Sequence, residues 1–288
     1  MSTINFTART ITDAAKSKTA CAVVPIFGRK TLSKAAEQID AATGGAISAA
    51  LKLGDFTADS GETLMLPGSD SIKRLLLIGC GPKAKFDRKA ARSFIHGVYS
   101  ALNATQSKDA IVHVEELTPT DADSSWLLDS LARHLTAASY RYSETVAKPK
   151  SALKTAKIVI NPGTSTSVRS AQSALDVGAA TGIGMKSAKN LANLPGNICT
   201  PTYLADQARA LAKGKAKLTT RILDEKKMAE LGMGALLSVS AGSDQSAKLI
   251  VMEYKGGKTN QKPYVLVGKG ITFDTGGISL KPGAKMDE

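Results

Sequence analysis

Residues 74–83 read RLLLIGCGPK, and the first half of the chain can be organised around them. The run 74–78 is almost wholly apolar, which predicts a strand covered on both faces, as in the parallel sheets of α/β proteins. After the glycine-rich turn comes Asp87, a residue type that can cap a helix. The apolar residues beyond it recur at helical spacing: Ala91, Phe94, Ile95, Val98 and Leu102. A strand, a tight turn and an amphipathic helix in this order indicate an α/β layer architecture.

The same alternation extends outward from this unit in both directions. Further strands are predicted at residues 20–26, 111–114 and 156–160, and further helices at residues 32–39, 47–53 and 126–138. We therefore expect an α/β fold class, with an N-terminal mixed-sheet α/β domain over residues 1–165.

The composition changes after this domain. Residues 166–195 form a long stretch rich in Ala, Ser and Gly, which predicts a linking helix that Pro195 and Gly196 end. Thr200 and Pro201 are typical of a helix start. A helix at 225–231 and strands at 217–223, 248–254 and 263–267 then predict a mainly parallel or mixed sheet. We expect a second α/β domain over residues 196–288.

Composition limits the classes of protein to consider. With 43% hydrophobic residues the chain can bury a core, and no apolar run approaches the roughly 18 residues of a membrane span. No secretory signal is visible at the N-terminus. Three scattered cysteines, Cys21, Cys80 and Cys199, suit a reducing compartment. These features predict a cytoplasmic protein without a membrane partner.

Two alternatives to an enzyme arise from charge and from glycine spacing. The formal net charge is +13, and lysines gather at Lys148, Lys150, Lys154 and Lys157, so binding to nucleic acid is one alternative, although no aromatic residues lie among them. Residues 79–84, from Gly79 to Ala84, match the loose dinucleotide pattern G-x-G-x-x-A, with Glu115 placed after a later strand. Pro82 removes an N–H from that loop, and a plain strand-to-helix turn explains the glycines equally well.

The stretch 265–282, VLVGKGITFDTGGISLKP, gathers two lysines and a carboxylate along a glycine-rich segment. Lys269 follows a predicted strand, at the sheet edge where α/β proteins carry their sites. Asp274 could bridge two divalent cations, an uncharged lysine amine could ligate one, and a charged Lys281 could stabilise an oxyanion. An ordinary surface loop with a Lys–Asp ion pair is the alternative. The histidines are scattered along the first half and indicate no metal site: His96, His113 (expected in the core) and His134.

Residues 267–288, VGKGITFDTGGISLKPGAKMDE, closely resemble the metal-binding segment of the leucyl aminopeptidase (cytosol aminopeptidase) family. Residues 190–204, NLANLPGNICTPTYL, resemble that family's entry into its catalytic domain, and the likeness extends loosely through residues 74–83 and 139–142. The resemblance implies a dinuclear zinc or manganese centre in which Lys269 ligates one metal, Asp274 is shared by both, and Lys281 contacts the substrate carbonyl oxygen. It also implies release of N-terminal residues, preferably leucine, from peptide substrates by a homo-hexamer; some bacterial members bind DNA.

The chain ends within this motif, at residue 288. In the family a further aspartate ligand, an Asp-x-Glu pair and an arginine that holds a bicarbonate base follow later. We therefore expect residues 196–288 to be an incomplete catalytic domain, and the chain to be an inactive piece of a longer gene product.

Overall fold

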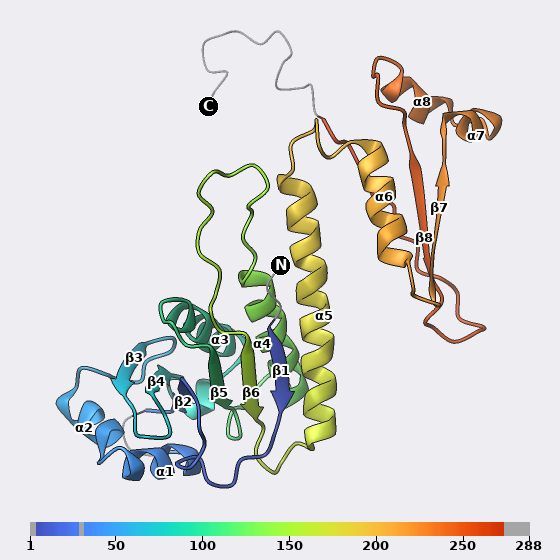
Figure 1. Ribbon diagram of the computed structural model, residues 1–288. Helices are drawn as coiled ribbons and strands as arrows, with labels where there is room; N and C mark the ends of the chain where they lie inside the picture. Colours follow the sequence, from blue (N-terminus) through green and yellow to red (C-terminus); the bar gives the residue numbers. More distant parts are fainter. Residues whose placement is uncertain (1–3, 29–31, 274–288) are drawn as a thin grey trace. The chain divides into compact units, whose positions relative to one another are not determined.

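The computed structural model describes residues 4–28 and 32–273, and the chain divides into two compact units, Met1–Asn190 and Leu191–Glu288 (Figure 1). The first unit is built on a six-stranded sheet. Its strands are β1 (Asn5–Ala8), β2 (Ala22–Ile26), β3 (Thr63–Pro67), β4 (Arg74–Gly79), β5 (Asp109–His113) and β6 (Lys157–Asn161). The α/β fold class predicted from the sequence is confirmed.

The strand order across the sheet is β1-β6-β5-β2-β4-β3. Strands β1, β6, β5, β2 and β4 pair in parallel, whereas β3 pairs antiparallel with β4 at one edge. The sheet is therefore mixed, as expected. Its order places β5 and β2 at the centre and brings the carboxyl ends of the five parallel strands to one edge, where ligands of α/β sheets commonly bind.

Helices cover both faces of this sheet (Figure 1). They are α1 (Lys34–Ala42), α2 (Ala46–Leu53), α3 (Arg88–Asn103), α4 (Ser124–Ala138) and α5 (Val168–Asn193), with a 3₁₀ turn, η1, at Lys83–Lys85. None of the helices in the described part combines the length and apolar character needed to cross a bilayer.

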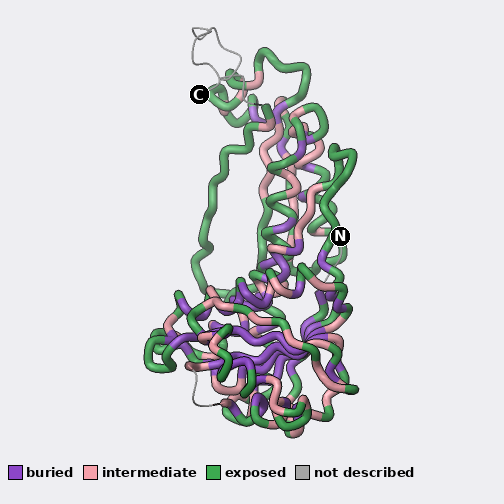
Figure 2. The backbone as a smooth tube through the Cα atoms, turned by 90° about the vertical axis from the view of Figure 1, so that its left-hand side faces the viewer, coloured by how far each residue is buried: buried purple, intermediate pink, exposed green. Residues whose placement is uncertain are grey.

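The central strands divide their side chains between two cores. On β4, Leu76 and Ile78 join the core that includes residues of α3, α4 and α5, while Leu75 and Leu77 join the core that includes residues of α1 and α2. All four side chains are fully buried, and the sheet is the most buried part of this unit (Figure 2). The near-continuous apolar run at residues 74–78 thus results from burial on both faces.

Helix starts follow the predicted capping chemistry. The Asp87 carboxylate accepts a hydrogen bond from the Ala90 amide (2.9 Å) at the start of α3. The Thr200 hydroxyl accepts one from the Tyr203 amide (3.2 Å) at the start of α6 (Pro201–Ala212). Both predicted caps are confirmed, because each oxygen satisfies a donor that the first helical turn leaves without a partner.

A side-chain amide closes the free edge of β1. Gln172 on α5 accepts a hydrogen bond from the Ala8 amide (2.8 Å) and donates one to the Phe6 carbonyl (3.2 Å). The same amide nitrogen also donates to Asp176 (2.8 Å), which fixes its orientation. Gln172 therefore takes the place of a neighbouring strand on this edge.

Two glycines let α5 approach α4 closely. A Cβ at Gly178 would overlap the carbonyl oxygen of Asp129, and one at Gly182 would lie 2.6 Å from the Thr136 Cβ. These contacts attach α5 to the first unit, and the division between the compact units falls inside this helix, after Asn190. The boundaries expected at residues 165 and 195 stay a prediction.

The second unit contains α6, β7 (Leu218–Leu223), α7 (Glu225–Glu230), α8 (Gly234–Ser240) and β8 (Leu249–Tyr254). Strands β7 and β8 pair antiparallel over a small core of Leu223, Met228 and Ala247. The described pair is antiparallel, so it departs from the mainly parallel sheet that was one expectation for this domain, whereas a mixed sheet, the other expectation, also contains such pairs. In the structure, exposure alternates along β7, as is typical of an antiparallel strand with one solvated face.

The strand expected at residues 263–267 is not formed. Val265, Leu266 and Val267 are 77%, 96% and 93% exposed. A buried strand needs hydrogen-bonded neighbours as well as apolar side chains, and no described strand pairs with this run. The apolar pattern indicates a preference for burial, which the described part of the chain does not satisfy.

Replacing Gln172 with Ala tests whether its side-chain amide stabilises the free edge of β1. Because alanine favours the helix, the substitution removes mainly the hydrogen bonds to Ala8 and Phe6, and we expect a loss of about 1–2 kcal/mol in unfolding free energy. Hydrogen exchange at the Ala8 amide should accelerate, and urea unfolding gives the energy. Ser173→Ala, at an exposed neighbouring position, is the matched control; equal losses in both variants would contradict a specific role for Gln172.

Candidate metal centre

The structure describes one of the three predicted site residues. Lys269 is exposed between Gly268 and Gly270, and a Cβ at either glycine would meet open space. Asp274 and Lys281 lie outside the described residues. The assembly of Lys269, Asp274 and Lys281 into one site therefore stays a prediction.

The two stretches that resemble the peptidase family do meet in space. At Gly196, in the first stretch, a Cβ would lie 2.8 Å from the Thr272 carbonyl oxygen and 3.2 Å from the Phe273 ring. Thr272 and Phe273 directly precede Asp274 in the second stretch. The sequence indicated Gly196 as a helix breaker; its close approach to the metal-binding stretch was missed.

Hydrogen bonds hold the chain around Gly196 in a defined turn. The Pro195 carbonyl accepts from the amides of Ile198 and Cys199, both at 2.9 Å. Helix α6 then begins under the Thr200 cap. This turn gives residues 272–273 a fixed backbone to pack against, and a glycine is required at the point of contact.

The side chains of the described ranges offer no other obvious catalytic metal centre. Residues 4–28 and 32–273 contain no group of three or more His, Cys, Asp or Glu side chains suited to one ion. Burial raises the pKa of the Cys21 thiol to about 12 and also raises the pKa of Cys80 and of Cys199. These thiols stay protonated at neutral pH, whereas metal binding requires thiolate.

The histidines divide into one core residue and a surface pair. His113 is 1% exposed, and its Nδ1 lies 3.2 Å from the Asn161 amide nitrogen, so the expected core position is confirmed. His96 and His134, far apart in sequence, lie on α3 and α4 with ring centroids 6.1 Å apart. Sequence spacing could not reveal this pair, because the two residues belong to different helices.

The glycines at residues 79–84 are explained by chain packing. A Cβ at Gly79 would overlap the Asp59 carbonyl oxygen, and Gly81 has a φ of +67°. Strand β2 lies between β4 and β5, which places Glu115 about two strand spacings, roughly 10 Å, away from the loop. The structure therefore adds no support for a dinucleotide site.

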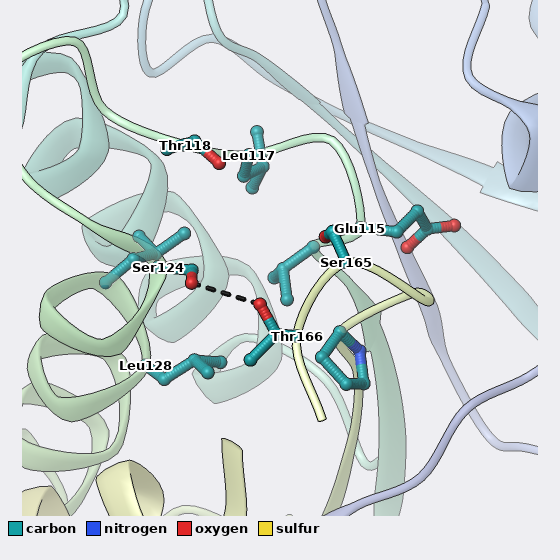
Figure 3. Close-up of a pocket in the computed structure, with 10 residues that line it drawn as sticks. Glu115, Leu117, Thr118, Ser124, Leu128, Ser165 and Thr166 are labelled. Carbon is teal, nitrogen blue, oxygen red and sulfur yellow. Dashed lines mark hydrogen bonds between the residues drawn. The ribbon is translucent and has the colours of Figure 1, made fainter. Parts of the chain in front are cut away.

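A small pocket lies at the carboxyl ends of β5 and β6 (Figure 3). The Ser124 and Thr166 hydroxyls lie 3.1 Å apart across it, and Leu117 and Leu128 contribute apolar walls. Its free volume of about 10 Å³ holds about one water molecule. The pocket occupies the edge where a ligand would be expected, but it is too small for a nucleotide.

Sequence profiles identify both halves of the chain. The profile of the cytosol aminopeptidase family, N-terminal domain, matches residues 23–149, and that of the cytosol aminopeptidase family, catalytic domain, matches residues 186–288. The chain belongs to the cytosol aminopeptidase family. The resemblance inferred from the two motif stretches is thereby confirmed.

Curated members of the cytosol aminopeptidase family align along nearly the whole chain. A probable cytosol aminopeptidase of Alkalilimnicola ehrlichii is 46% identical over 284 residues, covering 95% of this chain and 57% of the relative. A probable cytosol aminopeptidase of Thioalkalivibrio sulfidiphilus is 44% identical over 276 residues, covering 95% of this chain and 56% of the relative. The chain thus spans little more than half the length of these relatives.

Solved structures share the fold. A tomato leucine aminopeptidase mutant superposes with a TM-score of 0.73 at 23% identity, covering 96% of this chain and 55% of that protein. The bottromycin maturation enzyme BotP in complex with Mn gives a TM-score of 0.67 at 22% identity, and the match covers 93% of this chain and 51% of BotP. At these identities the comparison establishes the architecture of the chain.

Gly196→Ala should disturb the contact with residues 272–273. The added Cβ lies too close to the Thr272 carbonyl, so we expect a loss of about 1–3 kcal/mol, as for overpacking. Thermal unfolding of the second unit measures it. Gly234→Ala, where a Cβ meets open space, is the control; if both variants match the parent chain, the contact is not tight.

His134 should make the stability of the first unit depend on pH. Burial lowers the pKa of its imidazole below the usual 6.5, and the charges of His96 and Lys189 lower the pKa further. The unfolded chain therefore takes up this proton at a higher pH, so stability falls as pH drops from about 6.5 to the lowered pKa. In urea titrations across that window, His134→Gln should flatten the profile; parallel profiles would contradict this assignment.

Proposed function

We propose that a protein of the relatives' full length that contains this chain is a dinuclear metalloaminopeptidase, which releases N-terminal residues, preferably leucine, from peptides. Membership of the cytosol aminopeptidase family supports the reaction class. One structural observation supports the site: Gly196 packs against residues 272–273, which joins the two family-like stretches next to Asp274.

The donor set suits two divalent ions such as Mn²⁺ or Zn²⁺. Lys269 forms no ion pair with any described residue, so its amine is available as a nitrogen ligand once deprotonated. Asp274 would supply oxygen to both ions. The bound metals would activate water and polarise the scissile carbonyl. Lys281, kept charged, would stabilise the oxyanion that develops on that carbonyl.

Further properties rest on the family resemblance. We propose a homo-hexamer and a bicarbonate base for the full-length protein, and we propose that the chain as given is inactive. A cytoplasmic location is supported by three free, buried cysteines and by the word cytosol in the relatives' names.

Nucleic-acid binding is a second candidate. Lys148, Lys150, Lys154 and Lys157 are all exposed, and none forms an ion pair with the described residues. Free lysines on one chain segment can contact phosphates, and such binding weakens steeply as salt increases. Absence of binding to duplex DNA at low salt would exclude this candidate.

Lys281→Ala in the full-length protein tests the proposed reaction. Removing an oxyanion stabiliser should lower kcat on a leucyl amide substrate by about 10²–10³-fold, while Mn²⁺ affinity stays unchanged. Lys269→Ala should instead weaken Mn²⁺ binding, and a chelator should abolish turnover. Lys258→Ala, an exposed position, is the control. Unchanged turnover in Lys281→Ala would refute its role.

A further inference from the structure

Two imidazoles face one another on the outside of the first unit. His96 on α3 and His134 on α4 are both exposed, with ring centroids 6.1 Å apart at an interplanar angle of 73°. The Tyr99 ring lies 6.1 Å from that of His134 and completes an aromatic group across the two helices. The predicted catalytic residues include none of these side chains.

The two helices are fixed relative to each other beside this pair. The Tyr99 hydroxyl on α3 donates a hydrogen bond to the Ala138 carbonyl at the end of α4 (2.7 Å). Arg141 donates to the Tyr99 oxygen (2.8 Å) and to the Ala138 carbonyl (2.9 Å). The phenol is thus occupied by the backbone, and the imidazoles are held near one another before any ligand arrives.

We propose that His96 and His134 form a two-imidazole site for a late first-row transition-metal ion, with Zn²⁺ as the representative. Nitrogens that share a tetrahedral Zn²⁺ at 2.0–2.1 Å lie about 3.4 Å apart. Rotation of the two rings about their second side-chain torsions, which are broad for histidine, can turn one nitrogen of each toward a common point. Water would complete the coordination.

The surroundings define which ions are selected. The His96 Nε2 lies 3.3 Å from the Ser100 hydroxyl, which can orient the ring and leave Nδ1 for the metal. Among the residues that the structure describes, no Asp or Glu joins the two imidazoles in a metal-binding group. Imidazole nitrogens without a carboxylate favour Zn²⁺, Ni²⁺ and Cu²⁺ over Mg²⁺ and Mn²⁺.

The positive charge of Lys189 lies near the proposed site and would repel a bound metal ion, which can be tested. The Lys189 ammonium, which donates to the Ala137 carbonyl (3.4 Å), acts on His134 electrostatically. Its repulsion should weaken metal binding without altering the ligands. Lys189→Gln should therefore bind Zn²⁺ more tightly than the parent chain, a result that a purely structural role for the histidines would not produce.

The experiment is a Zn²⁺ titration of the chain followed through its imidazole NMR signals. His96 and His134 should shift together and saturate at one ion, whereas the buried His113 serves as an internal control. His96→Gln and His134→Gln should each weaken this binding by about tenfold or more. Mg²⁺ at the same concentration should leave both signals in place.

Zn²⁺ binding at Lys269 is distinguished from binding at the two histidines by repeating the titration on the Lys269→Ala variant. This variant should leave the histidine shifts unchanged. The proposal is overturned if the His96 and His134 signals stay in place with Zn²⁺. It is equally overturned if the two signals move independently, or if the double variant His96→Gln/His134→Gln binds Zn²⁺ with the parent's stoichiometry and affinity.

Discussion

Burial of β4 on both of its faces is the constraint on which the first unit depends. Four consecutive side chains, Leu75 to Ile78, leave water completely, each contributing about 1.5–3 kcal/mol. Such a strand is stable only if helices cover both sides of the sheet. The chain meets this requirement with α1 and α2 on one face and α3, α4 and α5 on the other. The loops at the carboxyl edge are therefore supported by a rigid frame.

The sequence predicted the elements whose own residues carry a strong pattern. Long amphipathic helices and apolar central strands were recovered because burial imposes a period on their side chains. Strands β1 and β3 were missed, since each is a short edge strand with alternate residues exposed. The strand predicted at residues 263–267 was wrong for the opposite reason. An apolar run indicates that residues tend to be buried, but it does not indicate which neighbouring strand they would pair with.

The candidate metal centre was likewise predicted in part from its own residues and missed where distant segments meet. The residue types and spacing around Lys269 and Asp274 indicated metal chemistry, and their likeness to a family gave each a role. The packing of Gly196 against Thr272 and the approach of His96 to His134 could not be predicted. Both contacts join segments distant in sequence, and such contacts leave no periodic trace in the residues that make them. Only the folded chain reveals them.

The glutamine on α5 has a consequence for self-association. A β-sheet can recruit a foreign strand wherever a row of backbone donors and acceptors is unsatisfied. Gln172 satisfies the Ala8 amide and the Phe6 carbonyl in that row on β1, so this border of the sheet is less open to an intruding strand. The opposite border, formed by β3, has an exposed Met65, and Pro67 at its end removes only one donor from that row. Any fibril or domain-swapped oligomer seeded by this sheet should therefore grow from β3, in one direction.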